Sequence, residues 1–273
     1  VFGPLVALLF YADQNLTFTK ADWAALKFTL KQAALSSLLS VLMAWPLALA
    51  LSRRHFIGRR LLILTLSVPF ILPVIVAVLG LLSIFGNSGL LNSLLKIFGL
   101  PVFSIYGLTG VLLAHIFFNI PLATRAFLLA IARRPAELER VADGLNLKFL
   151  MRFWILDWPI LRLVGPQIFS LIFALCLTSF AVVLTLGGGP KATTLELAIY
   201  QAFRFELDFG RAAFLALIQL SVAALACCFS IIIFGLPTNF NKGLDRQVHK
   251  KYLSIGSTAV SYTHLTLPTI LLV

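Results

Sequence analysis

Long apolar runs alternate with short polar connections along this chain. A helix needs about 20 mostly apolar residues to cross about 30 Å of hydrocarbon. Six runs have or approach this length, at 1–12, 28–51, 61–85, 106–132, 161–186 and 212–236. The first run starts at Val1 without a Met, so we expect it to be the end of a span that begins upstream. The pattern predicts an all-α, polytopic transmembrane bundle of about six spans.

The connections between these runs are short. Amphipathic segments are expected in three of them, around Trp23 within 13–27, at 90–98 within 86–105 as a re-entrant or interfacial helix, and at 195–203 within 187–211. None of the three is long enough to form a domain. The stretch 257–273 continues none of these patterns and is similar to a translated sequencing adapter. We therefore expect a transmembrane domain over 1–256 followed by a non-native tail.

Four prolines, Pro46, Pro69, Pro73 and Pro121, fall inside predicted spans. Proline has no N–H group and kinks a helix. Membrane helices tolerate it because neighbouring helices or water replace the lost hydrogen bond. These kinks serve either packing geometry or the lining of a cavity, and the sequence leaves both open.

Composition and charge support a membrane location and give the chain an orientation. Only 12% of the residues are charged and 60% are hydrophobic, which is too few charges to cover the surface of a soluble fold. The net charge of +12 does not indicate nucleic-acid binding, because the basic residues lie at span ends. Fifteen Lys and Arg residues fall on the side of 53–60, 125–162 and 242–251, and seven on the other. The positive-inside rule then places both ends of the chain in the cytoplasm.

Polar side chains inside the predicted spans are candidates for function, because their burial in lipid is costly. They could line a translocation path or form hydrogen bonds between helices. The candidates for the path are His115, Asn119, Ser170, Thr178 and Ser179.

The connection 133–160, on the predicted cytoplasmic side, is too polar to span a membrane. A helix is predicted to begin near Pro135 and to end at Asn146, since Asn adopts the left-handed conformation of a helix C-terminus more readily than other non-glycine residues. A second amphipathic helix is predicted over 148–156, ending before Pro159. Two short helices joined in this way form a knob that fits a cleft in a soluble partner. The alternative is an interfacial segment anchored by its tryptophans.

This segment resembles the EAA loop of ABC-importer permeases, whose pattern is Glu-Ala-Ala, three residues, Gly, and a closing Leu-Pro. Asn146 takes the position of the glycine and Ala142 that of the second alanine. The chain departs from the pattern at Arg140 and Val141, and Glu139 lies one residue early. The resemblance implies a type I ABC-importer permease fold with cytoplasmic coupling helices. It implies that the ATPase-coupling residues are Glu139, Ala142, Asp143, Asn146, Leu147, Phe149 and Pro159.

Three further stretches, 113–121, 179–202 and 211–213, are similar to the thiamine ABC-transporter permease family, whose members normally have two fused six-helix halves. This resemblance implies import of thiamine or its phosphates across the bacterial inner membrane. The implied partners are a periplasmic binding protein, a cytoplasmic ATPase dimer and a second permease half. Family analogy assigns the binding-protein contact to the outer turn formed by Gly187, Gly188, Gly189 and Pro190.

Other classes of function fit the sequence less well. A related permease for ferric iron, a polyamine or another solute stays open. A secondary transporter or channel without an ATPase would need charged groups inside its spans, whereas the carboxylates Asp13, Asp22, Glu196, Glu206 and Asp208 fall in outer connections. The sequence has no phosphate-binding GxxxxGK[ST] loop and its histidines are scattered. We therefore expect no enzyme activity, cofactor, metal site or nucleic-acid partner in this chain.

Overall fold

The computed structural model describes residues 18–53, 56–102, 104–187, 189 and 192–234. The regular elements in these ranges are helical, as the all-α prediction requires. They are α2 (Lys20–Arg53), α3 (Arg59–Thr65), α4 (Val68–Ile71), α5 (Val74–Phe85), α6 (Leu90–Ile97), α7 (Leu108–Ala132), α8 (Ala136–Gly144), α9 (Phe149–Arg152), the π-helix η1 (Phe153–Asp157), α10 (Trp158–Leu177), α11 (Phe180–Leu186), α12 (Leu195–Arg204) and α13 (Phe209–Phe234). The predicted run 1–12 and the tail 257–273 lie outside the described residues.

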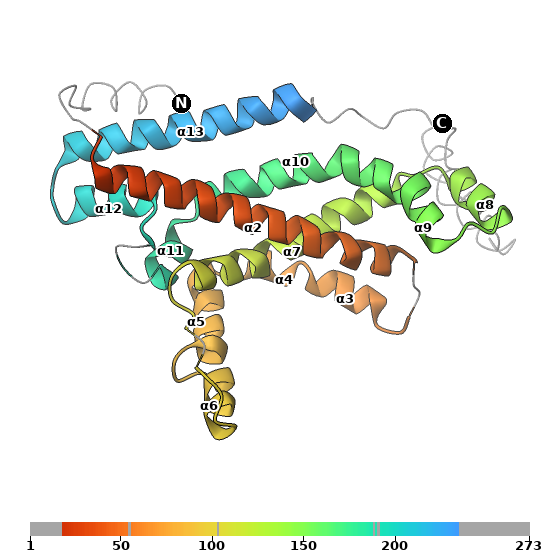
Figure 1. Cartoon of the computed structure of the whole chain (residues 1–273), viewed down its shortest axis with the longest axis horizontal. Helices are drawn as coiled ribbons and strands as arrows, with labels where there is room; N and C mark the ends of the chain where they lie inside the picture. Colours follow the sequence, from red (N-terminus) through yellow and green to blue (C-terminus); the bar gives the residue numbers. More distant parts are fainter. Residues whose placement is uncertain (1–17, 54–55, 103, 188, 190–191, 235–273) are drawn as a thin grey trace, which may run out of the picture.

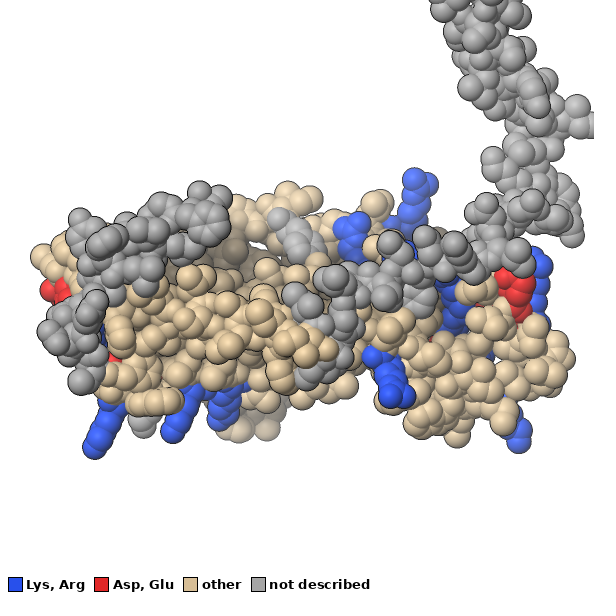
Figure 2. All heavy atoms as spheres, turned by 90° about the horizontal axis from the view of Figure 1, so that it is seen from above, with Lys and Arg blue, Asp and Glu red and all other residues tan. Residues whose placement is uncertain are grey.

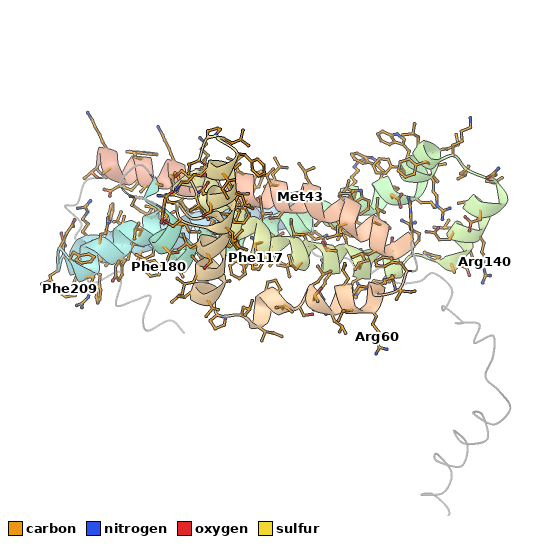
Figure 3. All side chains as sticks on the ribbon, turned by 90° about the horizontal axis from the view of Figure 1, so that it is seen from below. Met43, Arg60, Phe117, Arg140, Phe180 and Phe209 are labelled. Carbon is orange, nitrogen blue, oxygen red and sulfur yellow. The ribbon has the colours of Figure 1, made fainter. Side chains whose placement is uncertain are left out.

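Five stretches of the described chain are long and apolar enough to cross a membrane: Lys20–Arg53, Val74–Ile97, Leu108–Ala132, Phe149–Leu177 and Phe209–Phe229. Helices α2, α7 and α10 pack along one another, and α13 packs on α10 and α12 (Figure 1). Helices α8 and α9 lie at one end of this bundle, and α12 lies at the other. Figure 3 shows Arg60 and Arg140 toward the first end and Phe180 and Phe209 toward the second.

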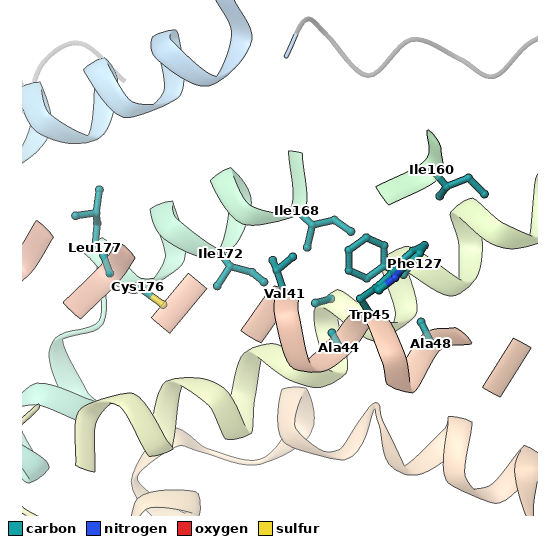
Figure 4. Close-up of a cluster of buried hydrophobic side chains, with 12 residues drawn as sticks. Val41, Ala44, Trp45, Ala48, Phe127, Ile160, Ile168, Ile172, Cys176 and Leu177 are labelled. Carbon is teal, nitrogen blue, oxygen red and sulfur yellow. The ribbon is translucent and has the colours of Figure 1, made fainter. Parts of the chain in front are cut away.

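Small residues allow α2 to approach its neighbours closely. Its buried face includes Ala33, Ser36, Ser40, Ala44 and Ala48, which recur every three or four residues and are fully buried. Small residues at such spacing bring membrane helices into close van der Waals contact. Larger side chains fill the rest of the core, where the rings of Trp45 and Phe127 meet edge to face with centroids 4.9 Å apart (Figure 4).

The outer surface is apolar between two charged ends. Large side chains such as Leu42, Ile75, Leu79 and Leu225 are exposed. Charged side chains in the view of Figure 2 lie over the two end regions of the bundle, with an uncharged surface between them. An apolar outer surface of this kind is suited to hydrocarbon, because lipid tails make no demand for polar groups.

Helix α2 starts earlier than the predicted run 28–51. Its N-terminus is a capping box in which the Thr19 backbone N–H donates to Asp22 Oδ2 over 2.9 Å and the Asp22 N–H donates to Thr19 Oγ1 over 3.2 Å. These bonds satisfy backbone donors that a helix leaves free at its first turn. The amphipathic piece around Trp23 is therefore the start of the span and not a separate segment.

The run 61–85 was predicted as one span, and this is wrong. The helix breaks after Thr65 and again after Ile71, so that α3, α4 and α5 follow one another as separate pieces. Pro69 occupies the first turn of α4, and Pro73 is the residue before α5. Both lack the N–H that a continuous helix would need. Helix α5 instead leads into α6, which matches the short helix predicted over 90–98, and the pair projects away from the bundle (Figure 1).

Two predictions about the run 161–186 and the segment before it also need correction. The helix predicted to end before Pro159 does not end there, since α9 passes through η1 into α10. Proline removes one hydrogen-bond donor from a continuing helix, and the wider π turn that precedes Pro159 accommodates the change in bonding. The run then breaks at Thr178 and Ser179, between α10 and α11.

Candidate functional site

The segment Ala136–Arg152, which comprises α8, the following turn and α9, forms the knob at one end of the bundle. Asn146 has a φ of 46°, the left-handed conformation predicted for it. Its N–H donates to the Asp143 carbonyl over 3.1 Å, and the Leu147 N–H donates to the Ala142 carbonyl over 3.2 Å. This pair of bonds is a Schellman motif, which satisfies the carbonyls left free at the end of α8. The turn between the two short helices is therefore well defined.

Asp157 anchors the knob to the spans. Its side chain is only 1% exposed, and it forms ion pairs with Arg53 at the end of α2 and, over 3.0 Å, with Arg134 after α7. Arg134 also donates to the Leu156 carbonyl over 2.8 Å. A carboxylate buried to this degree requires such partners, because removal from water is costly for a charge.

The pairing continues from Arg134 into the knob. Arg134 forms an ion pair with Glu139 on α8, and Glu139 forms a second with Arg152 on α9. Arg152 also contacts Asp143 over 2.7 Å. The result is a continuous ion-pair chain that runs through Arg53, Asp157, Arg134, Glu139, Arg152 and Asp143. It ties the knob to the ends of α2 and α7 and to the start of α10.

The ion-pair chain turns the polar side of α8 toward the bundle. The apolar side chains Leu138, Val141 and Leu145 are exposed as a result, and Phe149 and Leu150 at the start of α9 are about 70% exposed. Only Ala142 of the apolar stripe in α8 is buried. This apolar stripe therefore faces outward, while the ion pairs occupy the inner side.

The structure distributes the predicted coupling residues over three environments. Glu139 and Asp143 belong to the ion-pair chain. Ala142, Asn146 and Leu147 form the turn, Phe149 is exposed and Pro159 lies in the first turn of α10. Sequence reasoning missed the roles of Arg53, Arg134, Arg152 and Asp157, since it counted the arginines only as determinants of topology.

A second group of polar residues, the buried seam, lies between the helices. His115 on α7 is 3% exposed, and its two ring nitrogens pair with Ser36 Oγ on α2 over 2.9 Å and with Ser179 Oγ over 2.6 Å. Asn119 donates to Cys176 Sγ over 3.3 Å. His115, Asn119 and Ser179 therefore make hydrogen bonds between helices, and their place in a translocation path stays a prediction.

The seam includes the break between α10 and α11. A helix that ends inside the bundle leaves carbonyl groups without partners. Gln32 Nε2 from α2 donates to the Cys176 carbonyl over 2.9 Å, and Gln219 Nε2 from α13 donates to the Leu177 carbonyl over 2.8 Å. Side chains from neighbouring helices thus replace the lost backbone bonds. Sequence reasoning missed both glutamines, although each is a polar residue in an apolar run.

The remaining predicted residues lie apart from the seam. Ser170 lines an apolar cavity of about 700 Å³ between α10 and α13, whereas Thr178 lines a groove beside α12. They do not share one helical face, because α10 ends at Leu177. Gly187 ends α11 and Gly189 has a φ of 115°, while Gly188 and Pro190 lie outside the described residues.

Comparison with known proteins first defines the class of fold. No family model matches the chain. The structure matches a chain in the crystal structure of a bacterial alginate ABC transporter in complex with an alginate pentasaccharide-bound periplasmic protein, with a TM-score of 0.71 over 84% of this chain and 86% of that one. The two sequences are 17% identical, so this likeness concerns the fold alone. The chain has the fold of the membrane-spanning subunits of ABC transporters.

Sequence comparison then identifies its relatives. The chain is 47% identical over 214 residues to the thiamine transport system permease protein ThiP of Escherichia coli K12, which covers 78% of this chain and 39% of ThiP. It is 44% identical over 230 residues to ThiP of Brucella melitensis, with coverages of 82% and 42%. The chain is thus a homologue of the thiamine transport permeases, and the predicted resemblance is confirmed. It spans about two fifths of the length of these relatives.

Proposed function

We propose that the chain forms part of the membrane permease of an ATP-driven ABC importer that carries thiamine or its phosphates into the bacterial cytoplasm. The observation that carries this proposal is the identity of 44% to 47% with ThiP proteins over about four fifths of the chain. The ABC-transporter fold supports it independently of the sequence identity.

The knob is the proposed docking site for the ATPase dimer, which hydrolyses ATP outside this chain. Its exposed apolar stripe offers a surface for a soluble partner, and the ion-pair chain connects that surface to three membrane helices. Because an ion pair with a buried member resists separation, a displacement of α8 moves the ends of α2, α7 and α10 with it.

The opposite end, which carries α12, faces the periplasm in this proposal. The larger number of basic residues at the knob end orients the chain in this way by the positive-inside rule, with both ends cytoplasmic. A periplasmic binding protein delivers the vitamin at the α12 end, where the turn at Gly187–Pro190 is the proposed contact. A second permease half completes the translocation path, to which the buried seam contributes His115 and Asn119.

Uptake of labelled thiamine tests the proposal. The full-length permease that contains this chain is expressed with its binding protein and ATPase in a strain that lacks its own thiamine importer and thiamine synthesis. We expect uptake of thiamine, and loss of that uptake when the ATPase carries an inactive nucleotide site. Uptake of ferric iron or a polyamine in place of thiamine, or thiamine uptake that persists without the ATPase, would contradict the proposal.

A further inference from the structure

A groove of about 600 Å³ lies at the end of the bundle opposite the knob, between α12 and α13. These helices pack side by side at that end (Figure 1). Each contributes one face with residues three and four positions apart, and the floor comes from the break between α10 and α11. The lining residues with polar or aromatic side chains are Thr178, Phe180, Glu196, Tyr200, Phe203 and Gln219. We call this feature the α12 groove.

Among the residues that the structure describes, Glu196 is the only charged one in the lining of the α12 groove, and it is half-buried. Within the part of the chain that the structure describes, its carboxylate has no hydrogen bond or ion pair. Burial raises the pKa of Glu196 to about 7. The helix does not need this carboxylate as a cap, because Thr194 Oγ1 already accepts from the Leu197 N–H over 3.4 Å.

The arginines at this end do not neutralise Glu196. Arg211 pairs with Asp22 and with Glu206, each over 3.2 Å. Arg204 lies eight residues further along α12, about 12 Å along the helix axis at 1.5 Å per residue, and does not line the groove. A half-buried carboxylate without a counter-charge is costly, and a cationic ligand would remove that cost.

The walls of the α12 groove suit a flat ring. The rings of Phe180 and Tyr200 have centroids 5.1 Å apart, and Phe203 extends the aromatic lining. Aromatic faces attract organic cations. Gln219 also lines the groove, and its Nε2 donates to the Leu177 carbonyl at the helix break. The groove thus combines a carboxylate with aromatic walls.

We propose that the α12 groove binds a flat organic cation, with Glu196 as its counter-charge and Tyr200 as its stacking surface. Given the proposed function, on which the identity of this ligand rests, the cation is thiamine, whose thiazolium ring is positively charged. Thiamine occupies the groove after its release from the binding protein and before it passes along the buried seam, which begins at the same helix break.

Direct binding to the purified permease–ATPase complex in lipid nanodiscs, without the binding protein, tests this site. The probes are labelled thiamine and a neutral thiamine analogue in which a thiophene replaces the thiazolium ring. We expect the wild-type complex to prefer thiamine, and Glu196→Gln to raise the Kd for thiamine about tenfold while the Kd for the neutral analogue stays unchanged. Tyr200→Ala should weaken both ligands, and Tyr200→Phe should weaken neither.

Glu206→Gln is the matched control, since it removes the same charge from an exposed position at the same end of the molecule. It should leave both Kd values unchanged. An equal loss of thiamine affinity in Glu196→Gln and Glu206→Gln would overturn the proposal, and so would absence of thiamine binding to the wild-type complex. A loss of complex assembly in Glu196→Gln would also overturn it, because the groove would then be a contact with the second permease half. The proposed importer function is tested separately from this binding site: it would be wrong if cells with the intact system took up no thiamine.

Discussion

The substitution Asp157→Asn tests whether the ion-pair chain holds the knob on the bundle. It keeps the shape of the side chain and removes a charge that is 1% exposed and serves both Arg53 and Arg134. Removal of one member of a buried ion pair costs about 3–5 kcal/mol, because its partner is left as an uncompensated charge. Arg134 retains Glu139 and the Leu156 carbonyl, and Arg53 is 27% exposed and partly solvated. We therefore expect Asp157→Asn to lower the free energy of unfolding by an amount near the lower limit, about 3 kcal/mol.

The assay compares Asp157→Asn with Asp143→Asn in the full-length permease. Asp143 belongs to the same chain of ion pairs but is 65% exposed, so its substitution should cost at most about 0.5 kcal/mol. Thermal unfolding of the purified complex measures stability, and the amount of ATPase that co-purifies measures docking. Asp157→Asn should lower both, whereas Asp143→Asn should leave thermal unfolding unchanged. Equal losses of stability in the two variants would show that burial does not decide the strength of these ion pairs.

Three further predictions concern single residues, each measured by thermal unfolding of the complex. Asn146→Val should lower the free energy of unfolding by about 1–2 kcal/mol, because valine disfavours the left-handed backbone of residue 146, and Asn146→Gly should be neutral or stabilising. Equal effects of the two substitutions would contradict the left-handed helix cap at Asn146. Gln32→Leu should lower the free energy of unfolding by about 1–3 kcal/mol, because it leaves the Cys176 carbonyl unsatisfied. Gln167→Leu is the control and should cost little, since Gln167 on α10 is partly exposed and makes no hydrogen bond in the part of the chain that the structure describes. The raised pKa of Glu196 makes the folded protein retain a proton that the unfolded chain has lost, so stability should fall as pH rises from about 4.5 to about 7. Glu196→Gln should remove that part of the pH dependence. An unchanged pH profile of stability in this variant would show that Glu196 does not have a raised pKa.

Hydrophobic run length was informative where one helix makes one span. The run predicted at 106–132 corresponds to α7 within two residues at its start. It failed where a run contains a break. The breaks in 61–85 have a local signal in Pro69 and Pro73, but the break at Thr178 and Ser179 has none, since neither proline nor glycine occurs there. That break exists because Gln32 and Gln219 stabilise it from other helices.

The turn between the two helices of the knob could be predicted from the sequence, but the ion pairs that attach the knob to the bundle could not. The left-handed conformation of Asn146 follows from local chemistry. The pairing of Arg53 with Asp157 joins residues 104 positions apart, and nothing in the local sequence distinguishes Arg53 from other basic residues at span ends. The outward direction of the apolar stripe on α8 depends on these ion pairs. Because the ion pairs join residues that are distant in the sequence, the direction of the stripe could not be predicted from the sequence.

In the proposed function, ATP hydrolysis drives thiamine import through the knob. The most direct measurement is the ratio of thiamine imported to ATP hydrolysed in proteoliposomes that contain the full-length permease, its ATPase and its binding protein. We predict that the intact complex accumulates thiamine only with ATP and the binding protein. Deletion of residues 139–150 should abolish accumulation while leaving membrane insertion intact. Undiminished thiamine import per ATP in the deletion variant would show that the knob does not couple ATP hydrolysis to import.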